Sequence, residues 1–160
     1  MPKLATILSI AGLVAAGSAV PAQAQSPIEG TWKTGAESEI TISDCQTHYC
    51  GHITKIVVPP HIIERYGNNL EAIGTNFTDQ LNKDPALRGR PIQGMQILTL
   101  RTGRNPAVYD GEIYNPEDGN IYSGFVEVIN EDRIRLNGCV LYNLVCRGEE
   151  WERVAAPATP

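Results

Sequence analysis

The sequence has few bulky apolar side chains and no concentration of positive charge. Its 160 residues include only two phenylalanines, two tryptophans and two methionines. The formal net charge is -5, and lysines and arginines are scattered singly along the chain. Because phosphate binding needs a concentrated basic surface, we expect no nucleic-acid partner.

The short motifs of common enzyme classes are also absent. The sequence contains no Gly-x-Ser-x-Gly elbow, no Walker loop and no zinc-protease helix. Its three histidines, His48, His52 and His61, have no nucleophilic serine or free cysteine in an evident relation to them. We therefore predict a non-enzymatic protein, with no catalytic residues and no cofactor, and a hydrolase is the less favoured interpretation.

The first 24 residues have the features of a secretory signal peptide. Lys3 precedes an apolar stretch from Leu4 to Val20, and Ala22-Gln23-Ala24 is a small-x-small cleavage site. The stretch is shorter than the roughly 20 apolar residues that span a bilayer, so it predicts no stable membrane anchor. We expect residues 1–24 to be removed on export, with the periplasm favoured over secretion. Residues 25–154 then form one domain and residues 155–160 a disordered tail.

All four cysteines follow the predicted cleavage site and form two local pairs. Cys45 and Cys50 bracket one expected hairpin turn, and Cys139 and Cys146 bracket another. Residues that face each other across a tight hairpin reach disulfide distance, and an oxidising compartment favours the bond. We predict two disulfides.

A metal site is the alternative for the first pair. Cys45, His48, Cys50 and His52 are all suitable zinc ligands, but Cys-x2-His-x-Cys-x-His is none of the usual zinc spacings. In an extended strand, moreover, Cys50 and His52 point to one face while Cys45 comes from the facing strand. We therefore predict a stapled turn and no metal.

Alternation with a period of two is the main pattern after the predicted signal peptide. In residues 38–43, for example, Ile40 and Ile42 share one face and polar residues the other. The expected strands are 30–34, 38–43, 51–58, 95–101, the two halves of 107–129, 132–140 and 149–154. The two halves of 107–129 are joined by residues 115–120, where Asp118-Gly119 supplies a positive φ. About eight short antiparallel strands predict an all-β closed barrel, since closure removes exposed edges, with a β-sandwich as the alternative.

Residues 59–93 interrupt this pattern. Apolar residues recur at helical spacing from Ile62 to Ile73, but the sequence GNN at 67–69 breaks the repeat. We expect one short helix, or two helical turns, in a long excursion between strands. An excursion of this length serves either as a lid or as a plug for one end of the barrel.

A barrel of eight strands is wide enough to be filled by its own side chains or to hold one small ligand. The scarcity of bulky residues favours a pocket and a small-molecule ligand. The candidate polar residues near its mouth are Asp79, Asn82, Arg88, Arg90, Tyr109, Tyr114 and Tyr122. The two arginines suit a carboxylate or phosphate. Structural explanations remain open for all seven, as turn residues, partners of surface acids or cross-strand neighbours.

Several segments together resemble a known family. They are Gly30-x-Trp32, the Cys45-to-Gly51 hairpin, and the sequences DQLNKDPALRGRPIQGMQIL (79–98), YDGEIYNPEDGNIYSG (109–124) and LNGCVLYNLVCRGEEWERV (136–154). In this order they are similar to the small exported bacterial proteins grouped as domain of unknown function 2147. The resemblance implies export and a compact β-rich fold, and no established activity or cofactor. The excursion 60–77 is longer than is usual in that family.

A second resemblance concerns architecture. Lipocalin-like barrels also begin with Gly-x-Trp and place an arginine of the last strand over that indole. Trp32 and Arg153 have the corresponding places here, and such a contact contributes roughly 0.5 to 2 kcal/mol. The resemblance implies a lipocalin-like barrel closed by these two side chains.

Two functional hypotheses follow. The first is an exported barrel that binds a small ligand, and the second is an envelope interaction or structural protein that acts through its surface. An internal cavity open near Arg88 and Arg90 favours the first, whereas a packed barrel with a broad exposed apolar patch favours the second. Sequence leaves open the ligand's identity and the oligomeric state.

Overall fold

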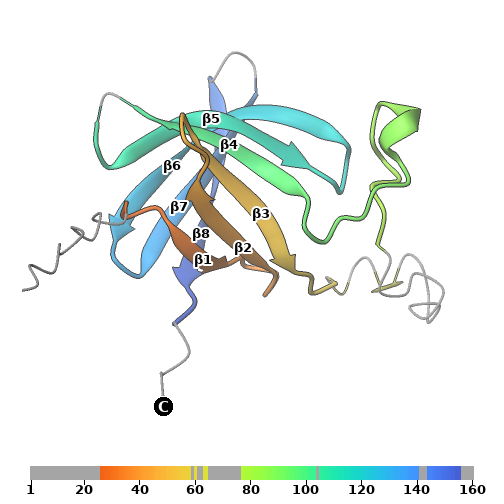
Figure 1. Ribbon diagram of the computed structural model, residues 1–160, viewed down its shortest axis with the longest axis horizontal. Helices are drawn as coiled ribbons and strands as arrows, with labels where there is room; N and C mark the ends of the chain where they lie inside the picture. The colour runs from red at the N-terminus through yellow and green to blue at the C-terminus, as the bar shows by residue number, and fades with distance from the viewer. Residues whose placement is uncertain are drawn as a thin grey trace, which may run out of the picture.

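Eight antiparallel strands close into a barrel in which each strand pairs with its neighbours in sequence and β8 returns to β1 (Figure 1). This computed structural model describes residues 26–58, 60, 63–64, 77–103, 105–140 and 144–155. The strands are β1 Gly30–Lys33, β2 Glu39–Asp44, β3 Tyr49–Lys55, β4 Gln96–Thr102, β5 Val108–Asn115, β6 Asn120–Asn130, β7 Arg133–Val140 and β8 Val145–Arg153. The predicted barrel is confirmed, and the β-sandwich alternative is wrong.

The predicted helix of the excursion lies mostly outside the described residues. Where the excursion is described continuously, from residue 77 onward, its helical content is a single 3-10 turn, Pro85–Leu87. The Asp84 carboxylate accepts a hydrogen bond of 2.9 Å from the backbone N–H of Ala86 and so caps this turn. No helix among the described residues is long and apolar enough to cross a membrane.

Residues that alternate along the predicted strands are alternately buried in the core and turned outward. Ile40 and Ile42 face the interior and are 3% and 1% exposed, while Thr41 between them faces outward and contacts Thr31 and Thr54. The buried core residues are Ile28, Trp32, Ile40, Ile42, Ile53, Leu98, Leu100, Tyr109, Ile113, Val126, Ile134 and Trp151. Two tryptophans, Tyr109 and nine branched aliphatic residues therefore form the core of this barrel.

Three glycines let the sheet curl around that core. Gly111, Gly124 and Gly138 lie side by side on β5, β6 and β7. A Cβ atom on Gly124 would lie 2.4 Å from the Asn137 carbonyl and 2.5 Å from Cδ1 of Ile113. Ile113 occupies the space that a side chain on Gly124 would need, so a larger residue at position 124 would clash with Ile113.

Successive connections of an up-and-down barrel alternate between two rims. The rim that holds the β3–β4 excursion also holds the β1–β2, β5–β6 and β7–β8 turns, and we call it the excursion rim. The other, which we call the Trp32 rim, holds the remaining turns and residues 26–29. Figure 1 shows the last part of the excursion, residues 77–93, in green beside the barrel.

The Trp32 rim is closed by the predicted pair. The guanidinium of Arg153 lies 4.0 Å from the ring centroid of Trp32, and it donates to the carbonyls of Pro27 at 2.8 Å and Glu29 at 2.7 Å. The indole Nε1 of Trp32 donates to the carbonyl of Ile28 at 2.8 Å, and Ile28 is fully buried. Arg153 therefore holds residues 27–29 across the end of the barrel.

Both predicted disulfides are present. Cys45–Cys50 closes the β2–β3 turn at the Trp32 rim, and Cys139–Cys146 joins β7 to β8 next to the excursion rim, each with an S–S distance of 2.10 Å. The side chains of Cys45, His48 and Cys50 gather within 4.8 Å of one another, and His52 is not part of that group. Since both sulfurs are bonded to each other, they are not thiolate ligands, which agrees with the predicted staple.

A candidate ligand groove beside the barrel

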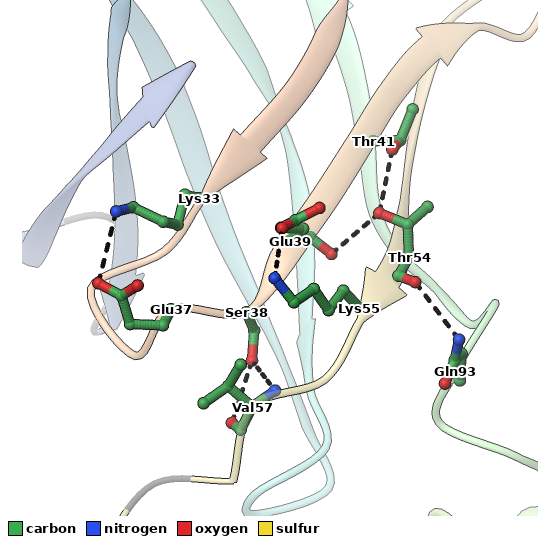
Figure 2. A network of polar contacts seen from close by, with 9 residues as sticks. All are labelled: Lys33, Glu37, Ser38, Glu39, Thr41, Thr54, Lys55, Val57 and Gln93. Carbon is green, nitrogen blue, oxygen red and sulfur yellow. Dashed lines mark hydrogen bonds and ion pairs between the residues drawn. The ribbon is translucent and has the colours of Figure 1, made fainter. Parts of the chain in front are cut away.

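Both described ends of the excursion are fastened to the excursion rim (Figure 2). At its start, the Ser38 hydroxyl donates to the Val57 carbonyl at 3.1 Å and accepts from the Val57 N–H at 2.9 Å. At its end, the Gln93 amide donates to the Thr54 carbonyl at 3.4 Å. The start of the excursion is thus bonded to the β1–β2 turn, and its end is bonded to β3.

Residues 77–93, which we call the strap, fold back on themselves. Thr78 and Pro91 form a β-bridge. The N–H of Asp79 donates to the Arg90 carbonyl at 3.0 Å, and the N–H of Ile92 donates to the Phe77 carbonyl at 2.7 Å. This pairing brings the side chains of Asp79 and Arg90 to the same place.

The centre of the strap is a fully buried carboxylate. One oxygen of Asp79 accepts from the Tyr114 hydroxyl at 2.5 Å. The other accepts from the Asn82 amide at 2.7 Å and from Nε and Nη2 of Arg90 at 2.9 and 2.8 Å. A buried charge is tolerated only when it is paired and hydrogen-bonded, and Asp79 meets both conditions.

Tyr114 connects this cluster to the outer wall of the barrel. Its neighbour Ile113 points into the core, and its cross-strand partner Ile121 is 66% exposed. Tyr114 therefore faces outward, and the strap lies against the outside of β5. Burial and, secondly, the hydrogen bond to Asp79 raise the pKa of Tyr114 above its ordinary value. The Arg90 guanidinium lies 5.2 Å from the Tyr114 ring centroid.

The β5–β6 turn packs directly on the strap. Gly119 has the predicted positive φ, 69°, and a Cβ atom there would lie 1.9 Å from the Leu81 carbonyl oxygen. The Lys83 ammonium donates to the Asp118 carbonyl at 3.2 Å. Only glycine satisfies both the backbone conformation and the close approach at this position.

An open groove of about 500 Å³ lies between the strap and this turn. Its lining residues are Asn82, Lys83, Asp84, Leu87, Arg90, Gln96, Tyr114, Gly119, Asn120 and Ile121. Leu87 and Ile121 expose 39% and 66% of their surface, and 37% of the Arg90 side chain is exposed. The carboxylate of Asp79 binds Nε and Nη2 of Arg90, and this pairing does not use the donors at Nη1.

Five of the seven predicted ligand residues come together here, and two do not. Asp79, Asn82, Arg90 and Tyr114 form the cluster, and Arg88 donates from Nε to the Asn82 carbonyl at 2.9 Å. The groove, which Asn82, Arg90 and Tyr114 line, is outside the barrel wall rather than at a mouth leading into it. The physical reason is the register of β5, which places Tyr114 on the face opposite to Ile113.

Tyr109 and Tyr122 lie elsewhere. Tyr109 is 3% exposed, bonds Ser26 through its hydroxyl at 2.8 Å and packs edge-on against Tyr49 near the Trp32 rim. Tyr122 donates to Asp118 at 2.6 Å, and this bond raises the pKa of Tyr122. Burial raises the pKa of Asp118, but hydrogen bonds, led by that from Tyr122, outweigh burial and lower it overall.

Sequence reasoning missed the apolar side of the groove. Leu87 and Ile121 carry no functional signal, because single exposed aliphatic residues are common on protein surfaces. Gly119 was identified as a turn residue, but its contact with Leu81 depends on two segments that are far apart in the sequence. The positive φ expected at Asp118-Gly119 was the one available hint.

Among the described residues, side chains on the inner face of β8 are exposed near the excursion rim. On β8, Trp151 points into the core, so Glu149 and Arg147 at alternate positions face the same side, yet both are exposed. Glu149 accepts from the N–H of Gly35 at 2.8 Å and from Nε1 of Trp151 at 3.0 Å. The two rims therefore differ, since Ile28 and Arg153 close only the Trp32 rim.

Comparison with known proteins agrees with this architecture. Residues 30–153 match a family described as "Uncharacterized protein conserved in bacteria (DUF2147)". Among solved structures, protein HP1028 of Helicobacter pylori, described as belonging to the lipocalin family, superposes with a TM-score of 0.64 at 18% identity, over 80% of this chain and 83% of that one. At this identity the likeness concerns the fold alone. None of the curated proteins matches the sequence.

Proposed function

We propose that this chain, which belongs to the bacterial DUF2147 family of uncharacterized proteins, is an exported module that binds a small ligand without transforming it. Export is supported by the signal-like residues 1–24 and by two disulfides, which persist in oxidising compartments. The lipocalin-like barrel is a scaffold suited to this role.

The groove beside Tyr114 and Arg90 carries the proposal. Its volume is within the range of small-molecule sites, and it combines apolar side chains with a few polar groups. The strap wall is rigid because the fully hydrogen-bonded Asp79 fixes Arg90, Asn82 and Tyr114 relative to one another. A preorganised wall spends little conformational entropy when a ligand binds.

The chemistry of the groove defines the ligand class. The positive charge of Arg90 is offset by Asp79, and Asp84 faces the same groove as Lys83. The site therefore suits a mainly apolar molecule with one hydrogen-bond acceptor, such as a carboxylate, placed against Nη1 of Arg90. A strongly anionic ligand such as a nucleotide does not fit this charge balance.

Binding of the fluorescent probe anilinonaphthalene sulfonate, an apolar anion, tests the groove. We expect saturable binding to the native protein and about tenfold weaker binding to Ile121→Glu, which places a carboxylate in the apolar wall. Ile129→Glu is the matched control, because Ile129 is also an exposed isoleucine of β6, 46% exposed, and does not line the groove. Absence of saturable binding, or equal loss in both variants, would contradict the proposal.

A surface-interaction role is the second candidate, and one observation favours it. The β7–β8 turn at the excursion rim exposes Leu144 (82%), Val145 (52%) and Val140 (45%). Exposed apolar residues gathered in one place mark protein contacts. If Leu144→Ser alters the sedimentation of the protein and the native protein shows no saturable binding of the probe, this turn, rather than the groove, is the functional surface.

A further inference from the structure

The Cys45–Cys50 bridge has a histidine in contact with it. Nε2 of His48 lies 3.4 Å from Sγ of Cys50. On the other side of the ring, Nδ1 lies 3.1 Å from the Thr47 hydroxyl. When that hydroxyl donates to Nδ1, the proton of the neutral ring resides on Nε2, which is the nitrogen that faces the sulfur.

The two cysteines of this bridge are unequally exposed. Cys50 is 3% exposed, whereas Cys45 is half-buried and is followed by the exposed Gln46 and Thr47 of the turn. A thiol arriving from solution therefore reaches Cys45 first. In thiol–disulfide exchange the attacked sulfur keeps the new bond and the other sulfur leaves as a thiolate, so Cys50 is the leaving group.

We propose that Cys45–Cys50 is an exchangeable disulfide whose reaction with external thiols is assisted by His48. A thiolate attacks Sγ of Cys45 and forms a mixed disulfide with it. The Cys45–Cys50 bond breaks, and Cys50 leaves as a thiolate that accepts a hydrogen bond from Nε2–H of His48. A second external thiolate then attacks the external sulfur of the mixed disulfide and releases Cys45. Two external thiols are thereby oxidised to one disulfide, and the bridge is reduced by two electrons.

His48 acts on the step that limits such exchange. A leaving thiolate departs faster when a neighbouring donor or positive charge stabilises it. The imidazole is already within contact distance of the leaving sulfur, and it is held there by the same turn that the bridge closes. The partner is therefore a thiol or dithiol, either a small molecule or an exposed protein cysteine pair.

The second bridge provides an internal reference. Cys139–Cys146 also joins neighbouring strands of one hairpin, and Cys146 is exposed. Its closest histidine in the sequence is His61, more than seventy positions away. It lies next to the excursion rim, whereas Cys45–Cys50 lies at the Trp32 rim, so exchange at one bridge is independent of the other and of the ligand groove.

Timed reduction of the folded protein by dithiothreitol, followed by alkylation and peptide mass spectrometry, measures each bridge separately. We expect His48→Asn to slow reduction of Cys45–Cys50 about tenfold and to leave Cys139–Cys146 unchanged. His52→Asn is the matched control, because His52 is two residues from Cys50 in the same strand but is outside the 4.8 Å group. The Cys45–Cys50 bridge of His52→Asn should be reduced at the wild-type rate.

Three results would overturn the proposal. The first is a Cys45–Cys50 bridge that dithiothreitol does not reduce in the folded wild type. The second is an equal rate of Cys45–Cys50 reduction in His48→Asn and His52→Asn. The third is slower reduction of both bridges in His48→Asn. The last outcome would show a change of fold rather than the loss of a local donor. Near-UV circular dichroism confirms that each variant is folded, and His48→Gln replaces His48→Asn if that variant is not.

Discussion

The hydroxyl of Tyr114 donates a hydrogen bond of 2.5 Å to the buried carboxylate of Asp79, which is 35 positions away in the sequence. This contact joins the strap to the outer wall of the barrel. The segments 79–98 and 109–124, which carry much of the family resemblance, meet at this bond. The cluster around it determines where the groove lies and which groups line it.

We expect Asp79→Asn to lower the free energy of unfolding by about 2 to 4 kcal/mol, because it leaves Arg90 without its buried partner. Urea denaturation followed by tryptophan fluorescence measures the change. Asp84→Asn is the control, since Asp84 is exposed and caps only a short 3-10 turn; it should cost about 1 kcal/mol or less. Equal costs for the two variants would show that the Asp79 cluster does not stabilise the fold.

Ionisation of Tyr114 should weaken the same cluster at alkaline pH. Its pKa is raised in the folded protein, so the native state favours the neutral phenol. The stability that it contributes is complete below the ordinary tyrosine pKa of about 10 and is lost as pH rises through the folded value. Ultraviolet titration of tyrosinate should show late ionisation of Tyr114 and Tyr122, since the pKa of each is raised, and Tyr114→Phe should remove one of these two late components. A titration that is unchanged in the variant would contradict the assignment.

Gly119→Ala should separate the turn from the strap. The alanine would have to adopt a positive φ and would place its Cβ against the Leu81 carbonyl, so we expect a loss of at least about 2 kcal/mol. Gly89→Ala is the matched control in the strap, because a Cβ there meets no atom within 4 Å. Thermal unfolding compares the two variants, and similar melting temperatures would argue against close packing of the turn on the strap.

Most of the barrel was predictable from local pattern. The alternation at Ile40 and Ile42 identified a strand and its buried face, and residues 115–120 identified a hairpin turn. Strand boundaries differed at several ends: β3 is Tyr49–Lys55 rather than 51–58, and the largest difference is at β8, which begins at Val145 rather than at residue 149. Residues 145–148 include a cysteine, an arginine and a glycine without apolar alternation, so only pairing with β7 reveals them as strand.

The candidate site was predictable only in its polar members. Asp79, Asn82 and Arg90 stand out as polar groups close together in the sequence, but their mutual contacts depend on the β-bridge between Thr78 and Pro91. Tyr109 and Tyr122 have the same residue type as Tyr114 and lie elsewhere. Position along the strand, rather than chemical type, decides which tyrosine meets the strap.

The sequence by itself determined most of the strands and the two disulfides, because each depends on local spacing, while the Trp32–Arg153 closure was expected from the resemblance to lipocalin-like barrels. Only the tertiary structure decided that the groove lies outside the wall, that Gly119 packs on Leu81 and that His48 faces the sulfur of Cys50. These contacts depend on register and on how loops fold back, and register arises from packing between distant segments, which no local pattern encodes.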